Sequence, residues 1–268
     1  MLISSNVQTE LALADIAQGI RSYEVWGMLG WQDIKQRYRR SVLGPFWLTL
    51  STGAMVIALG FVYASIFRMS PQQYLPFLAI GLVVWTLISG VITEGCLAFI
   101  SAEAMIKQMR LPLTAHACWM VWRNVIIMGH NFLIILIVLV VFDLVPSVLM
   151  LMLLIAALVI LVLNALWVAL SLGLICSRYR DIPPIVGSLL QVVFFLTPIL
   201  WHPSLLPGRQ RLVDWNPLHH FFQVTRGPLL GELPSATSWA VVVATTVLGF
   251  LCTFILFAKY RRRIAYWV

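Results

Sequence analysis

The chain has little charge. Of its 268 residues only 10% are Asp, Glu, Lys or Arg, whereas 61% are hydrophobic. A soluble domain is typically about a quarter charged, so this composition excludes a soluble globular protein. Acidic residues are the scarcer kind, because 18 Lys and Arg stand against only 10 Asp and Glu. The composition therefore predicts an all-α integral membrane protein.

The chain also lacks the motifs of catalysis. It has no Gly-x-x-x-x-Gly-Lys-[Ser/Thr] phosphate loop, no nucleophile elbow and no His-Glu-x-x-His motif. Its four cysteines have no metal or disulfide spacing. His202, His219 and His220 lack a supporting carboxylate, so we predict no metal site. We expect a protein that is not an enzyme and holds no cofactor itself.

Six apolar stretches are present, and a helix needs roughly 20 residues to cross the hydrocarbon layer. The predicted spans cover residues 46–67, 75–100, 124–142, 148–176, 182–201 and 239–258. Two domains follow from this division: a cytoplasmic N-terminus at residues 1–45 and a six-helix transmembrane domain at residues 46–268. Residues 1–20 have no basic segment followed by an apolar core, so we expect no cleaved signal peptide.

The cations lie mostly on one side of these spans. Fourteen of the 18 fall on that side, and the other four are Arg68, Arg209, Arg211 and Arg226. Lys and Arg beside a span hold that side in the cytoplasm. The protein is therefore expected to be a multi-pass membrane protein with both termini in the cytoplasm. The basic charge is explained by membrane topology, so we expect no nucleic acid partner.

The N-terminal region carries an amphipathic pattern from residue 16 to residue 38. Its apolar residues recur at spacings of four and three, as Ile16, Ile20, Tyr23, Gly27, Trp31, Ile34 and Tyr38. A basic amphipathic helix with aromatic residues is typical of one that lies in the membrane surface. The alternative is an ordinary packed helix of a soluble N-terminal region.

A basic cluster and a helix break follow this pattern. Residues 33–47 read Asp-Ile-Lys-Gln-Arg-Tyr-Arg-Arg-Ser-Val-Leu-Gly-Pro-Phe-Trp, and the Gly-Pro pair lets the next helix leave at a new angle. This segment resembles the corresponding motif of the membrane subunits of ABC-2-type polysaccharide exporters. That family moves lipid-linked O-antigen, capsule and teichoic acid chains. Three later segments are similar to the same family: Arg-Tyr-Arg-Asp-Ile at 178–182, Thr-Pro-Ile at 197–199, and Asn216-Pro217 followed by Arg226.

The resemblance implies the bacterial inner membrane as the location of the protein, and it also implies the partners. Two copies of the chain would form a homodimeric channel above two copies of a separate ABC ATPase, which would bind ATP and Mg²⁺. The substrate would be a polysaccharide linked to undecaprenyl diphosphate, with O-antigen as the leading choice. Arg37, Arg39 and Arg40 would attract the lipid diphosphate by charge-assisted contacts. Their alternative role is that of positive-inside anchors.

A short amphipathic helix is expected between the second and third spans, with Ser101 as its cap and Pro112 as its limit. Two adaptable methionines lie one turn apart between charged residues, which suits a groove on another protein. The resemblance implies that this is the coupling helix that docks on the ATPase; a solvated loop helix is the alternative. The residues that we assign to this coupling are Asp33, Lys35, Glu103, Met105, Lys107, Met109 and Arg110.

Residues 202–238 are too long and too rich in proline for a simple turn. A short helix is predicted between Asn216-Pro217 and Gly227-Pro228, dipping back into the outer leaflet as a re-entrant hairpin between the fifth and sixth spans. We assign the gate and hinges to Gly44, Pro45, Pro198, Asn216, Pro217 and Arg226. Aromatic side chains would let sugar rings slide, and the candidates for the channel are Trp47, Trp85, Phe194 and Phe195. The more common role of such residues, and the alternative here, is an aromatic belt at the membrane interface.

Polar residues inside the spans are functional candidates. Helix–helix hydrogen bonding near an interface is the expected role of Glu94, His130, Asn131 and Asn164. Glu94 is also the first of them to test as a partner for an arginine of the basic cluster. Other functions stay open. One is an ABC-2 exporter of drugs or small lipids. Another is a polytopic enzyme of lipid-linked sugars, which would need carboxylates gathered at one membrane face.

Overall fold

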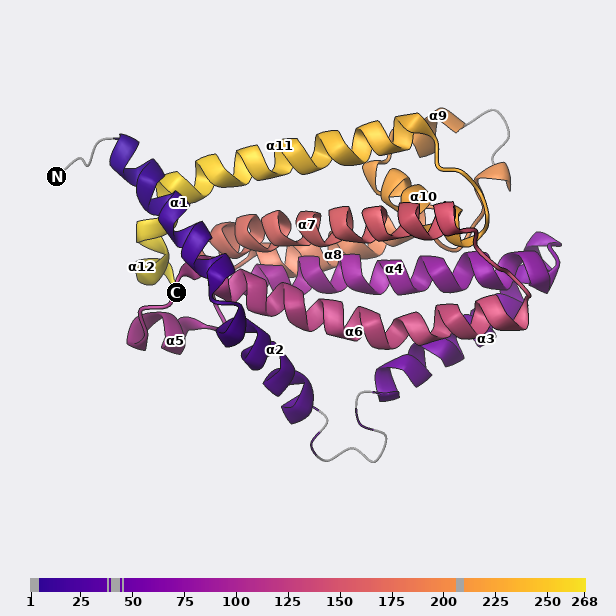
Figure 1. Ribbon diagram of the computed structural model, residues 1–268, viewed down its shortest axis with the longest axis horizontal. Coiled ribbons are helices and arrows are strands. Elements are labelled where there is room, and N and C mark those ends of the chain that lie inside the picture. Colours follow the sequence, from indigo (N-terminus) through magenta and orange to yellow (C-terminus); the bar gives the residue numbers. More distant parts are fainter. Residues whose placement is uncertain (1–4, 38, 40–43, 45, 206–209) are drawn as a thin grey trace.

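The computed structural model describes residues 5–37, 39, 44, 46–205 and 210–268. These residues form helices, turns and loops, with no strand among them. Five helices are long and apolar enough to cross a membrane. They are α3 (Phe46–Phe67), α4 (Pro71–Leu97), α6 (Leu113–Val141), α7 (Val148–Arg178) and α11 (Ala236–Tyr260). Figure 1 shows α4, α6, α7 and α11 running roughly side by side, with α3 leaning away from them.

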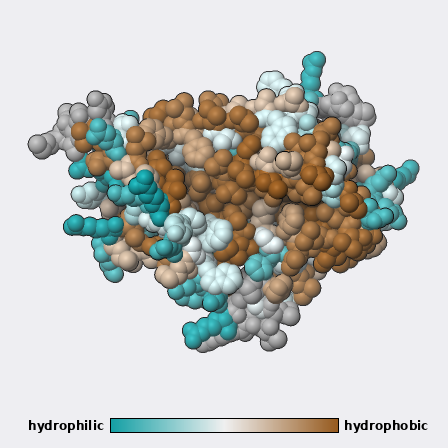
Figure 2. Space-filling view, in the orientation of Figure 1, coloured by the Kyte–Doolittle hydropathy of each residue, from teal (hydrophilic) through white to brown (hydrophobic). Residues whose placement is uncertain are grey.

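Helix α4 is the centre of the bundle. In an apolar segment of 18 residues, 72% of α4 is buried inside the molecule, whereas only 17% of such a segment of α3 is buried. α4 packs against α3, α6 and α7, and its residues from Tyr74 to Val84 are all buried. The other long helices thus keep apolar faces on the outside. Figure 2 shows hydrophobic side chains over the middle of the visible face and hydrophilic ones gathered toward its ends, as a membrane protein requires.

The sixth predicted span, residues 182–201, is a shorter helix in the structure. α8 runs from Ile182 to Leu196 and is 15 residues long, which is about 22 Å at a rise of 1.5 Å per residue. Its end is set by Thr197 and by Pro198, which has no N–H to continue the helical hydrogen bonds. A count of six membrane-crossing helices does not follow from helix length alone.

The N-terminal amphipathic segment is two helices rather than the one predicted. α1 (Ser5–Arg21) and α2 (Tyr23–Arg37) are separated at Ser22, whose hydroxyl donates to the carbonyl oxygen of Gln18 at 2.7 Å and competes with helix continuation. The predicted apolar stripe is also only partly used. Tyr23 and Trp31 are exposed, whereas Gly19 and Gly30 are buried against α6.

Small residues explain this choice of face. A Cβ atom at Gly19 would lie 2.6 Å from the Cβ of Thr114, and one at Gly30 would lie 2.8 Å from the ring of Trp122. Larger side chains would hold α1 and α2 away from α6. Ile20, Tyr23 and Trp31 of the predicted stripe are therefore left for lipid or another chain, whereas Ile34 is buried.

The helices α1, α5 (Glu103–Gln108) and α12 (Ile264–Trp267) lie at one end of the bundle (Figure 1). We call it the basic end, because its described cations include Lys107, Arg110, Arg178, Arg180, Lys259, Arg261, Arg262 and Arg263. The predicted Ser101 cap of α5 is wrong: Ala102 holds the N-cap position. The hydroxyl of Ser101 instead donates to the carbonyl oxygen of Leu97 at the end of α4, at 2.8 Å.

The opposite end carries the segment after α8. It contains η1 (Pro203–Leu205), α9 (Gln210–Asp214) and α10 (Pro217–Leu229). Asn216 caps α10 as predicted, since its side chain accepts a hydrogen bond from the N–H of Leu218 at 3.0 Å. The helix passes the predicted Gly227-Pro228 stop and ends at Leu229, shortly before Gly231 turns the chain with a φ of +78°. α10 packs against α4, α7 and α11.

Candidate functional site

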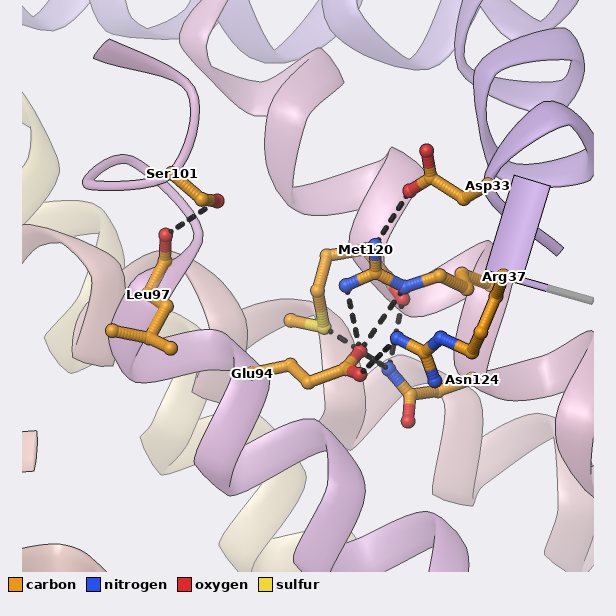
Figure 3. A network of polar contacts seen from close by, with 8 residues as sticks. Asp33, Arg37, Glu94, Leu97, Ser101, Met120 and Asn124 are labelled. Atoms are coloured by element: carbon orange, nitrogen blue, oxygen red, sulfur yellow. Dashed lines mark hydrogen bonds and ion pairs between the residues drawn. The ribbon is translucent and has the colours of Figure 1, made fainter. Parts of the chain in front are cut away.

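Glu94, near the basic end of α4, is the centre of a polar network that joins three helices (Figure 3). Its Oε2 accepts hydrogen bonds from Nδ2 of Asn124 at 2.6 Å and from Nη2 of Arg123 at 2.8 Å. Its Oε1 lies 3.4 Å from Nη2 of Arg37, at the end of α2. The predicted helix–helix hydrogen bond of Glu94 is the one with Asn124. The alternative partner, an arginine of the basic cluster, is present as Arg37, although the closer cation is Arg123 on α6.

The same network brings in Asp33, which we had assigned to ATPase coupling. Nη1 of Arg123 lies 2.5 Å from Oδ2 of Asp33, so this guanidinium is held between one carboxylate of α2 and one of α4. The side chains of Arg123 and Glu94 are 20% and 23% exposed. Partial burial strengthens such contacts relative to surface ion pairs. The network therefore fixes the end of α2 against the membrane bundle.

Asp15 of α1 makes a second connection at the basic end. Its buried carboxylate accepts hydrogen bonds from the backbone N–H of Leu113 at 3.2 Å and from that of Thr114 at 3.0 Å. It also accepts from the Thr114 hydroxyl at 2.9 Å and from Nε of Arg261 at 2.8 Å. α6 has Pro112 at its N-cap and no side-chain cap of its own. Asp15 thus caps α6 from another helix and ties it to the end of α11.

The α5 helix presents the predicted coupling residues to solvent. Lys107 and Glu103 form an ion pair at 2.7 Å, and the hydrogen bond from Lys107 lowers the pKa of Glu103. Met109 is 53% exposed directly after the helix, and Arg110 is exposed beside it. Lys35 is exposed on α2, with its ammonium 5.7 Å from the ring centroid of Trp31. α5 therefore leaves an exposed methionine beside charged side chains.

A groove of about 460 Å³ lies between α3, α4 and α8, which we call the α3–α4–α8 groove. Three of the four predicted channel aromatics line it, namely Trp85, Phe194 and Phe195. The ring centroids of Trp85 and Phe194 are 5.4 Å apart. Hydroxyl and amide side chains share this lining, from Thr52, Thr86, Ser89, Thr93 and Gln191. Trp47 is exposed near the start of α3 and does not line the groove.

At the opposite end, three predicted gate residues come together. Nη1 of Arg226 donates to the carbonyl oxygen of Pro198 at 3.0 Å, and Nδ2 of Asn216 donates to Oγ1 of Thr197 at 2.9 Å. The Tyr74 hydroxyl donates to the carbonyl oxygen of Leu200. These bonds join α10 and the start of α4 to the segment that follows α8, and Pro217 begins α10.

Five predicted residues remain. Gly44 has a φ of +56°, a left-handed conformation that suits glycine. Arg39 is exposed, whereas Arg40 and Pro45 fall outside the described residues. Met105 is half-buried on α5.

The polar residues of the spans behave differently from one another. Asn164 of α7 donates to the hydroxyl of Thr246 on α11 at 2.7 Å, which confirms its predicted helix–helix bond. His130 contacts the carbonyl oxygen of Ile126 in its own helix. Asn131 is fully buried and its side-chain nitrogen and oxygen have no partner among the described residues, so the helix–helix bond predicted for it is absent from this part of the structure.

Two central residues of these polar networks were not identified from the sequence. Arg123 was counted only among the positive-inside cations, and Asp15 was not considered at all. Neither residue has a local signal, because its partners are distant in the sequence. Asp15 contacts Leu113, Thr114 and Arg261, and Arg123 contacts Asp33 and Glu94. Only a tertiary contact could reveal them.

The fold and these sites define the class of protein, a multi-pass helical membrane protein with a polar network at one end. The chain matches the ABC-2 type transporter family over residues 24–230. It belongs to that family, which makes it a transport subunit of the inner membrane. Such permeases normally work with an ATPase partner.

Two curated relatives agree with this assignment. Both are O-antigen export system permease proteins RfbA of Klebsiella pneumoniae. One is 24% identical over 192 residues and the other 24% identical over 196 residues. Each similarity covers 70% of this chain and 73% of the relative.

Proposed function

We propose that this chain is the permease of an ATP-driven exporter of lipid-linked polysaccharide, with O-antigen as its leading substrate. Two copies would form the channel, and two copies of a separate ABC ATPase would bind ATP and Mg²⁺. The observation that carries the proposal is the α3–α4–α8 groove, which combines aromatic and hydroxyl side chains between apolar helices. The two relatives that export O-antigen support the choice of substrate.

The topology of this proposal has six crossings. α8 and the residues that follow it, up to Trp201, make the sixth crossing, since Ile199 and Leu200 are buried and continue its apolar character. The basic end is then cytoplasmic, in accord with the positive-inside rule, and both termini lie there. α10 enters the opposite face as a re-entrant helix, which its burial against α4, α7 and α11 supports.

Arg37 is the best placed cation for the lipid diphosphate. Its side chain is 44% exposed, and its contact with Glu94 is long, at 3.4 Å. An ion pair of that kind is worth little, so a diphosphate with two charged groups can replace it. Arg39 is exposed two residues further on. The basic cluster thus serves as substrate contact and cytoplasmic anchor together.

The groove gives the first test. Trp85→Ala and Phe194→Ala should each lower the export rate roughly fivefold, because an aromatic contact is worth about 1 kcal/mol beyond its buried area. Surface polymer would be measured in cells that depend on this permease, with permease abundance in the membrane as the reference. Phe250→Ala is the matched control, since Phe250 is a partly exposed aromatic on α11 outside the groove. Equal export in all three variants would remove the groove from the substrate path.

The coupling role of α5 gives a second test. The double variant Met105→Ala and Met109→Ala should weaken co-purification with the ATPase by roughly tenfold in apparent affinity, since it removes apolar anchors at an interface. Gln108→Ala, an exposed position of the same helix, serves as the control. Wild-type protein should bring down the ATPase at two copies per two permeases. A protein that purifies alone would contradict the transporter assembly itself.

A further inference from the structure

A polar cavity of about 200 Å³ lies at the end of the bundle opposite the basic end. α10, the residues after α8 and the residues after α10 surround it. Its lining differs from the apolar surfaces of the spans, because five of its side chains carry polar groups: His202, His219, Gln223, Arg226 and Glu232. Two aromatic rings complete it, those of Phe77 and Phe222. We call it the Arg226 cavity.

Arg226 is only 7% exposed and has too few partners for a buried cation. Nη1 donates to the carbonyl oxygen of Pro198, but Nε and Nη2 have no acceptor among the described residues. Within that part of the chain, no carboxylate forms an ion pair with Arg226. Buried arginines are almost always paired, because desolvation of an uncompensated charge costs several kcal/mol. The described residues thus supply neither a counter-charge nor acceptors for Nε and Nη2.

The aromatic contacts do not replace that counter-ion. The guanidinium carbon of Arg226 lies 3.6 Å from the ring centroid of Phe77 and 5.5 Å from that of Phe222. Such contacts use the flat faces of the guanidinium. The N–H groups in its plane still need acceptors.

The two unpaired donors lie on one edge of the guanidinium. Nε and Nη2 point in the same direction in its planar fork, which is the arrangement that binds a carboxylate or phosphate through two parallel hydrogen bonds. Gly81 lets the guanidinium pack closely against α4, since a Cβ atom there would lie 2.3 Å from Nη2 of Arg226. Any other residue at position 81 would displace the guanidinium.

Neighbouring groups favour an oxygen-rich ligand. Oε1 of Gln223 accepts a hydrogen bond from the Ser238 hydroxyl at 2.9 Å, so the group that this amide has left to offer a ligand is its Nε2 donor. Nδ1 of His219 is buried and has no partner among the described residues. Glu232 acts in the opposite direction. It is exposed on the lining, and its carboxylate repels an anion that approaches Arg226.

We propose that the Arg226 cavity binds an oxyanion, a carboxylate or phosphate group held by Nε and Nη2 of Arg226. The cavity is large enough for such a group together with water. The proposal does not depend on which polymer the transporter carries. The oxyanion can belong to a soluble molecule or to a lipid headgroup, and both present the same oxygen atoms to the guanidinium.

The test uses the full-length protein in uncharged detergent, with inorganic phosphate and acetate as probes and chloride at matched ionic strength as the reference. We expect both probes to raise the thermal unfolding temperature in a saturable manner. Nanodiscs of phosphatidylglycerol and of phosphatidylcholine separate the two sources. Stabilisation by phosphate in detergent identifies a soluble anion, whereas stabilisation only in phosphatidylglycerol identifies a headgroup.

Single substitutions should change the affinity for the anion in opposite directions. Glu232→Gln should tighten binding roughly fivefold, because it removes a like charge from the cavity. Arg226→Gln should abolish binding, and Arg226→Lys should weaken it by losing the two-bond geometry. Asp143→Asn is the control, an exposed acidic residue in a left-handed turn that asparagine tolerates.

Three outcomes would overturn the proposal. One is an absence of saturable stabilisation in every condition, which would mean that water alone fills the cavity. The second is equal binding by wild type and Arg226→Gln. The third is weaker binding by Glu232→Gln than by Asp143→Asn. If the Arg226 variants do not fold, the comparison of Glu232→Gln with Asp143→Asn decides alone.

Discussion

Replacement of Asp15 by Ala is expected to lower the free energy of unfolding by about 3–5 kcal/mol, the cost of removing one partner from a buried ion pair. The carboxylate of Asp15 receives the first N–H groups of α6 and the guanidinium of Arg261. After the substitution, the buried Thr114 and the partly buried Leu113 and Arg261 lose this acceptor. Denaturant titration in mild detergent, followed by helical circular dichroism, measures the loss.

Glu10→Ala is the matched control for this prediction. Glu10 is exposed on the same helix, five residues before Asp15, so its removal should change stability by less than about 0.5 kcal/mol. Asp15→Asn should not rescue, because its amide brings N–H donors toward Arg261 and toward the N–H groups of α6. Asp15 and Glu10 variants of similar stability would show that the connection between α1 and α6 adds nothing to the fold.

Replacement of Glu94 by Ala is expected to cost about 2–3 kcal/mol and to stop export. Glu94 holds Arg37 of α2, Arg123 of α6 and Asn124 of α6. Without it, Asp33 becomes the remaining carboxylate for Arg123, and α2 is no longer joined to α4. Unfolding in detergent and polymer export in cells measure the two effects separately.

Glu103→Ala is the control for Glu94→Ala, because Glu103 is also a glutamate paired with a cation. Its pair with Lys107 is exposed, with both side chains about half accessible, and exposed helical pairs contribute about 0.3–0.5 kcal/mol. Glu94→Gln separates charge from size, since it keeps one acceptor oxygen. A Glu94→Ala protein that stays stable and exports normally would show that Glu94 has no role in holding α2.

The sequence predicted the membrane helices where their signal was local. The first span, at residues 46–67, coincides with α3, and the fourth, at 148–176, agrees with α7 to within two residues. The third was predicted at 124–142, yet α6 begins at Leu113. Residues 113–123 include the polar His116 and Arg123, so the sequence did not predict them as part of a membrane span. They are helical because Asp15 caps them and because α1, α2 and α4 cover them.

The candidate site divides in the same way. Residue type and topology were enough to select Glu94 as a possible partner of an arginine of the basic cluster, since both lie at the same membrane face. They were also enough to select Trp85, Phe194 and Phe195 as channel candidates, and these three line one groove. Stronger neighbours such as Arg123 were not predictable, because one cation among many on a basic face has no distinguishing local pattern.

Apolar length, the position of cations and helix-breaking residues are local properties, so the sequence by itself determined the fold class and the approximate helices. Which helix is central was decided by tertiary structure, because the spans are similarly apolar while only α4 is mostly buried. Tertiary structure also joined Asp15 to Arg261, 246 positions apart, and left one edge of the buried Arg226 without an acceptor. Such contacts depend on where helices pack in space, and their energies arise from burial that no local pattern encodes.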